Sequence, residues 1–223
     1  MEYSTVINFV LLQKSFFPFI SASKISLCIA FFAFLLGISF GSVLAFLLRS
    51  KFFFIRLLAS AYCMIIRGTP MLLHVMGLFL FLPVFGISLS PITVAIIAIG
   101  LNSAAYMSRV IEAGIDSVDE GQWEAGQTLG LNKFQVLRFI IFPQAIKIIF
   151  PMIKSEIVTL IKDSSLASII GVIEISQQGQ LIASTTYDIF TAYAGIAISY
   201  LVLTLTVSLL CFFLEKGLFY VRT

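Results

Sequence analysis

The strongest constraint on this chain is a series of apolar runs that are long enough to cross a lipid bilayer. Residues 25–48 contain no charged side chain, and about 20 helical residues span the hydrocarbon core of a membrane. Of the 223 residues, 60% are hydrophobic and 11% are charged, so a water-soluble domain could not bury this much apolar surface. We therefore predict an all-α integral membrane protein with a single transmembrane domain over residues 1–223. Its five expected transmembrane helices are residues 25–48, 57–85, 92–107, 145–161 and 192–214.

The positions of the basic residues indicate the side of the membrane on which each loop lies, because lysine and arginine are retained on the cytoplasmic side. Basic residues follow the first span, occupy the polar loop after the third span and recur in the C-terminal tail. The link at 86–91 and the segment 164–191 contain none. This alternation predicts that the N-terminus lies outside and the C-terminus is cytoplasmic. Lys14 and Lys24 then lie outside, against the rule.

Two further segments are apolar enough to meet the membrane. Residues 4–19 are predicted to form an amphipathic helix on the outer interface. Residues 166–183 fit either a re-entrant element or a sixth span. A sixth span would place Lys216 and Arg222 outside, so five spans are favoured.

The loop at 116–138 is polar and must lie outside the lipid. Asp119 and Glu120 precede a short helix, where acidic groups can cap free N–H groups and favour the helix dipole. Gly130 can end that helix. The composition alone fits an ordinary solvated connector, whereas a short rigid helix also suits insertion into a soluble partner.

The order of residues in this loop resembles the signature of permease subunits of ABC importers. That signature reads Glu-Ala-Ala, three residues, Gly, nine residues, Ile, one residue, Leu-Pro. The positions that match in register are Glu124, Ala125, Gly130, Ile140 and Pro143. Gly126 replaces the second alanine and Phe142 replaces the leucine. A glycine lowers helix propensity by about 1 kcal/mol relative to alanine, so we expect Gly126 to loosen this helix without removing it.

Four other segments are similar to permeases of polar amino-acid ABC importers, the histidine, arginine and glutamine group: 67–70, 102–106, 121–125 and 160–166. The resemblance implies a multi-pass protein of the bacterial inner membrane that pairs with a second permease subunit, identical or different. It also implies two copies of a separate ATPase that uses ATP-Mg, and an extracytoplasmic amino-acid-binding protein. The residues that would couple to the ATPase are Glu124, Ala125, Gly126 and Gly130.

No phosphate-binding loop of the form GxxxxGK[ST] occurs in the chain. Any ATP must therefore be hydrolysed by another chain, and we expect this one not to be an enzyme. No catalytic triad and no cluster with metal-ligand spacing stands out, so neither catalytic residues nor a cofactor is assigned to this chain.

Two acidic residues lie inside the fourth expected span. Glu156 and Asp163 are seven residues apart, about two helical turns, so both lie on one face of a helix. Each charge near the bilayer centre costs roughly 2.5–3.5 kcal/mol on insertion scales, so such residues face a partner, water or a ligand. A cationic side chain or an α-ammonium group would satisfy them. Internal pairing with Lys154, Lys162 or Arg67 would do so equally well.

Four more residues complete the predicted substrate-binding set. Arg67 precedes a Gly-Thr-Pro break that contains Thr69, where an opened helix can offer N–H groups to a carboxylate and the arginine can clamp it. His74 stands where the resembling family carries glutamine, and Asn102 is a polar amide inside a span. Simpler roles are a snorkelling arginine, an interior histidine and an interhelical hydrogen bond.

The function expected from these features is ATP-driven import of polar amino acids, with a preference for cationic ones, by alternating access. The alternative is an ion-coupled secondary carrier, in which Glu156 and Asp163 relay protons and His74 titrates.

Overall fold

The computed structural model describes residues 7–219, which are almost entirely helical. Helix α1 (Phe9–Leu48) starts far ahead of residue 25, because Asn8 caps it by accepting a hydrogen bond from the backbone N–H of Leu11 at 3.1 Å. Residues 9–19, predicted to form a separate interfacial helix, are the first turns of α1, and residues 4–6 lie outside the described part. Forty residues at 1.5 Å each give about 60 Å, roughly twice the hydrocarbon thickness.

The second apolar run forms two helices, α2 (Phe53–Gly68) and α3 (Met71–Phe81), and a short 3-10 turn, η1 (Leu82–Phe85). The axis bends by 104° at the break between them. Thr69 and Pro70 have extended backbones there, because proline has no N–H to donate and disfavours helical geometry in the residue before it. The predicted span 57–85 is thus a broken pair.

Helix α4 (Pro91–Asp116) is the centre of the molecule and packs along α1. A Cβ atom on Gly37 would lie 2.6 Å from the Oγ of Ser103, and one on Gly41 would lie 2.8 Å from the Cβ of Met107. Small residues at this spacing let two helices approach closely, which is the main source of helix association in lipid. The small size of Ser103 and its neighbour Ala104, which are both buried, serves this packing.

The remaining chain begins with α5 (Glu120–Thr128), α6 (Lys133–Val136) and a π-helical turn, η2 (Leu137–Ile141). It continues with α7 (Phe142–Asp163), a 3-10 helix η3 (Ser164–Ile170), α8 (Ile175–Thr186) and α9 (Ile189–Phe219). Twelve residues make α8 about 18 Å long, too short to cross a membrane, so the segment 166–183 is not a sixth span.

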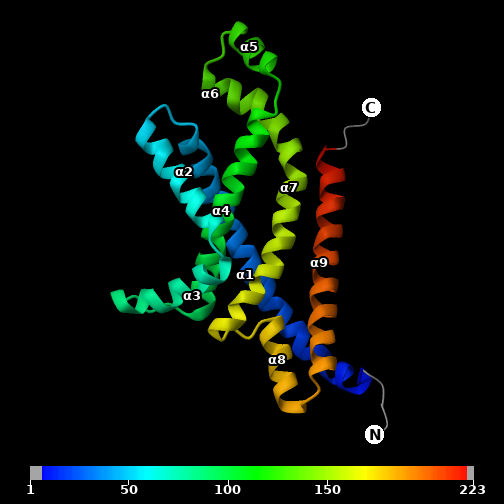
Figure 1. Ribbon diagram of the computed structural model, residues 1–223. Helices are drawn as coiled ribbons and strands as arrows, with labels where there is room; N and C mark the ends of the chain where they lie inside the picture. Colours follow the sequence, from blue (N-terminus) through cyan, green and yellow to red (C-terminus); the bar gives the residue numbers. More distant parts are fainter. Residues whose placement is uncertain (1–6, 220–223) are drawn as a thin grey trace.

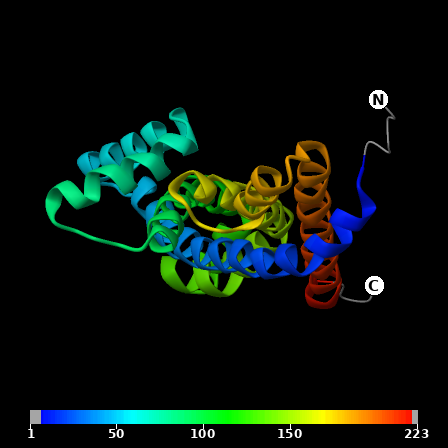
Figure 2. The same cartoon turned by 90° about the horizontal axis from the view of Figure 1, so that it is seen from below.

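Four of the described helical segments are long and apolar enough to cross a membrane, and counting the broken pair α2–α3 as one span gives five. Helices α5 and α6 lie at one end of the bundle, toward which α9 runs, and α8 lies at the opposite end (Figure 1). Figure 2 shows that α2 and α3 project to one side and α9 stands on the other. The largest core cluster joins α1, α3, α4, α7 and η3 through residues that include Ile29, Val75, Ile99, Leu160 and Ala167.

Candidate functional site

A cavity of about 250 Å³ lies between the start of α3, the middle of α4 and the second half of α7. Its lining residues are Thr69, Met71, Asn102, Tyr106, Glu156, Thr159 and Asp163. The helix break exposes Thr69, whereas the other polar groups come from single faces of α4 and α7. Four of the six predicted substrate-binding residues therefore meet in one place: Thr69, Asn102, Glu156 and Asp163. We call this space the α3–α4–α7 cavity.

The two carboxylates of the cavity form no ion pair with a described side chain. Within residues 7–219, neither Glu156 nor Asp163 has a lysine, arginine or histidine nitrogen within 4.0 Å. Glu156 accepts a hydrogen bond from the hydroxyl of Ser103, with 2.5 Å between Oε1 and Oγ. The ammonium group of Lys154, one suggested partner, lies 5.4 Å from the ring centroid of Phe212 on α9 instead. Lys162, another suggested partner, attracts the Asp163 carboxylate but forms no ion pair with it within 4.0 Å. The cavity is thus lined by two acidic groups that have no described ion-pair partner.

His74 is not among the lining residues of the cavity. Its Nε2 is 2.7 Å from the Oγ1 of Thr69, and its Nδ1 is 3.2 Å from the Nδ2 of Asn102. The imidazole therefore contacts two lining residues without lining the cavity itself.

Arg67 lines a neighbouring cavity of about 480 Å³, together with Tyr106 and Arg109. Its guanidinium carbon lies 5.1 Å from the ring centroid of Tyr106, within the range of a cation–π interaction. Tyr106 lines both this cavity and the α3–α4–α7 cavity. The predicted site is therefore divided between two cavities, with the acidic residues lining one and the arginine lining the other.

The sequence reasoning missed Tyr106 and Thr159 as lining residues. Tyr106 is four residues after Asn102 and Thr159 is three residues after Glu156, and residues at these spacings share a helix face. Helical spacing from Asn102 and Glu156 would therefore have identified both residues.

Helix α5, in the loop predicted to couple to an ATPase, has a defined start and end. The side chain of Asp119 accepts a hydrogen bond from the N–H of Gly121 at 2.8 Å, and Gly130 has the left-handed φ of +78° that ends the helix. Glu124 and Ala125 are exposed, whereas Gly126 is buried. A Cβ atom on Gly126 would lie 2.8 Å from a methyl carbon of Val136, so the glycine allows α5 to pack closely on α6 and η2.

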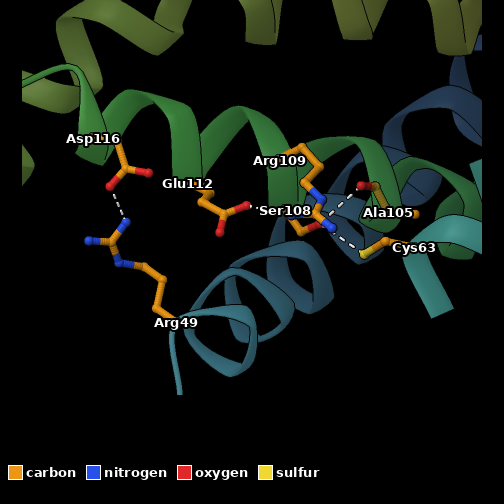
Figure 3. A network of polar contacts seen from close by, with 7 residues as sticks. All are labelled: Arg49, Cys63, Ala105, Ser108, Arg109, Glu112 and Asp116. Carbon is orange, nitrogen blue, oxygen red and sulfur yellow. Dashed lines mark hydrogen bonds and ion pairs between the residues drawn. The ribbon is translucent and has the colours of Figure 1, made fainter. Parts of the chain in front are cut away.

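Polar contacts hold the base of this loop (Figure 3). An ion pair between Arg49 and Asp116 ties the end of α1 to the end of α4. Nearby, the thiol of Cys63 on α2 lies 3.4 Å from the hydroxyl of Ser108 on α4. These contacts thus join α1 and α2 to α4, the helix that leads from the cavity toward α5.

A second buried carboxylate, Glu174, has no counterpart in the sequence analysis. Glu174 is 0% exposed and caps α8, accepting a hydrogen bond from the N–H of Gln177 at 2.9 Å. Its other oxygen accepts from the hydroxyls of Tyr200 on α9 at 2.5 Å and Ser26 on α1 at 3.3 Å. Burial raises the pKa of the Glu174 carboxyl, and these hydrogen bonds oppose the rise. The sequence shows Glu174 only as a single glutamate among apolar residues, so its three hydrogen-bond partners could not be predicted from the sequence.

The chain has recognisable relatives. Residues 37–220 match the family model of the binding-protein-dependent transport system inner membrane component. The chain is 36% identical over 204 residues to the putative glutamine transport system permease protein GlnP of Rickettsia conorii, covering 91% of this chain and 93% of that one. It is 35% identical over 220 residues to the L-cystine transport system permease protein TcyB of Bacillus subtilis, covering 98% and 94%.

Solved structures show the same fold. One chain of an amino acid ABC transporter crystallised with histidines superposes with a TM-score of 0.88 at 36% identity, covering 95% of this chain and 99% of that one. A chain of the methionine ABC transporter MetNI superposes with a TM-score of 0.71 at 17% identity, covering 89% and 96%, which shows the fold alone.

A multi-pass helical bundle with a polar internal cavity and an exposed helix at one end defines a membrane transport subunit. The chain belongs to the family of binding-protein-dependent transport system inner membrane components, and is a permease subunit of a bacterial ABC importer. The family resemblance, the permease fold and the inner-membrane location predicted from the sequence are confirmed. The comparisons favour the ATP-driven importer over the ion-coupled secondary carrier.

Proposed function

We propose that this chain forms the membrane pathway of an importer for polar amino acids, with the α3–α4–α7 cavity as its substrate site. The observation that carries the proposal is the pair of carboxylates, Glu156 and Asp163, that face a small polar cavity without a cation. An amino acid brings at least one ammonium group, and a ligand of that charge balances this lining. The names of the relatives, which refer to glutamine and cystine, agree with a polar amino acid.

The other predicted residues have distinct roles in this proposal. Thr69 and Asn102 contact the ligand, and His74 supports both from behind. Arg67 attracts the carboxylate group from the far side of Tyr106. A cavity of this size suits a single amino acid rather than a larger solute.

The energy for transport comes from other chains in this proposal. Two copies of an ATPase bind ATP-Mg on the cytoplasmic face, and α5 with Glu124, Ala125, Gly126 and Gly130 enters a cleft in that ATPase. A second permease, identical or different, completes the pathway, and an extracytoplasmic binding protein delivers the amino acid. Closure of the ATPases moves α5 and reorients the cavity from outward to inward facing. The position of α5 and α8 at opposite ends supports a cytoplasmic α5 end and an outward α8 end.

Uptake by the reconstituted complex in liposomes tests the substrate site. The complex is supplied with internal ATP and with labelled L-arginine, L-histidine, L-glutamine or L-cystine. We expect uptake of at least one amino acid, and its loss in a Glu156→Gln, Asp163→Asn double variant. The control is Glu215→Gln, which removes one charge from the last turns of α9. Uptake that the double variant retains in full contradicts the assignment of the cavity.

The coupling role of α5 has a separate test. Glu124→Lys should abolish transport-stimulated ATP hydrolysis because the reversed charge lies on the exposed face that meets the ATPase. Insertion of the variant in the membrane should be unchanged. Glu215→Lys, a charge reversal on a different helix, serves as the control. Normal stimulation in Glu124→Lys would remove α5 from the coupling path.

A further inference from the structure

The hydrogen bonds around His74 fit one direction of donation along a chain. The hydroxyl of Thr69 donates to the carbonyl oxygen of Ile65 at 2.7 Å, so its hydrogen is already used. The Oγ1 of Thr69 can then accept from the Nε2 of His74, 2.7 Å away. On the other side of the ring, the amide nitrogen of Asn102 can only donate, and it lies 3.2 Å from Nδ1. These contacts point to a neutral His74 imidazole with its proton on Nε2.

This tautomer determines which atom of Asn102 faces the ligand. The Nδ2 atom points to His74, which does not line the cavity, whereas Asn102 itself does. The carbonyl oxygen Oδ1 is left for the open space. Exchange of the two amide atoms would place an oxygen against the bare Nδ1, with two acceptors facing each other and no hydrogen between them.

The fixed polar side chains of the cavity are then acceptors. Asn102 presents an oxygen, Glu156 and Asp163 present carboxylates, and the hydroxyl hydrogen of Thr69 is committed elsewhere. Only two hydroxyl groups of the lining, on Tyr106 and Thr159, can rotate to donate or accept. The acceptors outnumber what a single α-ammonium group requires, so they suit a ligand with a second donor group.

We propose that His74 is a positioning residue for specificity: through its Nε2 proton it turns the Asn102 oxygen toward the cavity, so that the permease selects amino acids whose side chains donate hydrogen bonds. Guanidinium, ammonium, imidazolium and primary amide side chains belong to this class. The inference rests on the proposed substrate site. It adds that the selection depends on a residue that does not touch the ligand.

The tautomer can be measured directly because the chain contains one histidine. The full-length permease, made with ¹⁵N-labelled histidine and purified without a polyhistidine tag, is placed in lipid for solid-state NMR. We expect a protonated Nε2 and a bare Nδ1 resonance. A protonated Nδ1 would overturn the proposal, because it could not accept from Asn102.

Selectivity is measured by equilibrium dialysis on the purified permease–ATPase complex, without the binding protein. Two pairs of ligands match in shape and differ in one donor group: L-arginine with L-citrulline, and L-glutamine with L-glutamate. In the unaltered complex we expect the donor-rich member of at least one pair to bind more tightly. His74→Leu, which cannot form either hydrogen bond, should lower that preference about tenfold, the value of one lost hydrogen bond.

His74→Gln is the matched variant, since a glutamine can accept from Asn102 with its oxygen and donate to Thr69 with its nitrogen. We expect it to restore the preference. If His74→Leu weakens both members of a pair equally, His74 is only structural and the proposal fails. A lack of preference in the unaltered complex also contradicts it, without affecting the proposed substrate site. Binding of none of the four ligands would contradict that site, and this inference with it.

Discussion

Two acidic sites in this permease show how the same chemical group serves different purposes. Glu174 is completely buried, and all of its hydrogen-bond partners, including Tyr200 and Ser26, belong to the protein itself. Glu156 and Asp163 line a cavity, and Glu156 accepts one hydrogen bond, from Ser103. No described lysine or arginine forms an ion pair with any of these three carboxylates.

The two acidic sites differ in how many of their carboxylate oxygens still have room to accept a hydrogen bond. At Glu174 the donors come from α1, α8 and α9, so the carboxylate joins three helices at the α8 end. In the α3–α4–α7 cavity, most of the acceptor capacity is left for a ligand. A buried carboxylate with a complete set of donors is a structural element, and one with free capacity beside a cavity is a binding element.

The largest effect on stability should come from Glu174→Leu. The substitution leaves the hydroxyls of Tyr200 and Ser26 and the N–H of Gln177 without an acceptor, which costs roughly 3 kcal/mol. Thermal unfolding of the purified chain in lipid measures the loss. Glu156→Leu, the same change in the cavity, should cost less than half as much. A larger loss for Glu156→Leu would reverse the contrast between the two sites.

Glu156→Gln should have its main effect on binding. The amide keeps the shape and still accepts from Ser103, but it removes a negative charge that faces the ligand, so affinity should fall about tenfold. The unfolding temperature should change little. Equilibrium dialysis with the amino acid that the unaltered complex binds gives the affinity. A lower unfolding temperature with intact affinity would indicate that Glu156 has a structural role.

The pH dependence of stability should distinguish Glu174 further. Burial raises its pKa in the folded protein above the value of about 4.5 in the unfolded chain. The folded state then holds its proton more tightly, so this contribution to stability is present below that value and is lost as the pH rises through the higher folded pKa. The unfolding temperature of the unaltered chain should therefore fall over this window relative to that of Glu174→Gln. A constant difference between the two would contradict a raised pKa.

The smallest effect is expected at a third kind of acidic residue. Asp116 pairs with Arg49 at the base of the α5 loop, and both side chains are well exposed. Such pairs contribute at most about 1 kcal/mol. Asp116→Asn should therefore shift the unfolding temperature only slightly, and added salt should reduce even that shift. A loss of stability as large as that of Glu174→Leu would show that solvent exposure does not determine how much each of these three acidic sites contributes to stability.

Much of the architecture could be predicted from local sequence. Apolar runs of sufficient length predicted the membrane helices, and the Gly-Thr-Pro segment predicted the break that exposes Thr69. Asp119 and Gly130 marked the two ends of α5. These features depend on transfer free energy, on proline geometry and on capping, which act within a few residues along the chain.

The candidate site was predictable only in part. Helical spacing placed Glu156 and Asp163 on one face, and both line the cavity with Asn102. Arg67 lines a neighbouring cavity and contacts Tyr106, and His74 contacts Thr69 and Asn102 without lining the α3–α4–α7 cavity. The helical register predicts which face of a helix a residue occupies. Which residue of another helix it contacts depends on how the helices bend and cross.

By itself, the sequence determined that this protein crosses a membrane, where its second span breaks and which polar segment projects from the lipid, because each follows from the chemistry of neighbouring residues. Only the tertiary structure decided which polar groups are satisfied. Glu174 finds partners on α1 and α9 that lie 148 and 26 residues away, whereas Glu156 and Asp163 keep free acceptor capacity. Hydrogen bonds between distant segments form when helices pack together, and a one-dimensional pattern of residues does not contain that information.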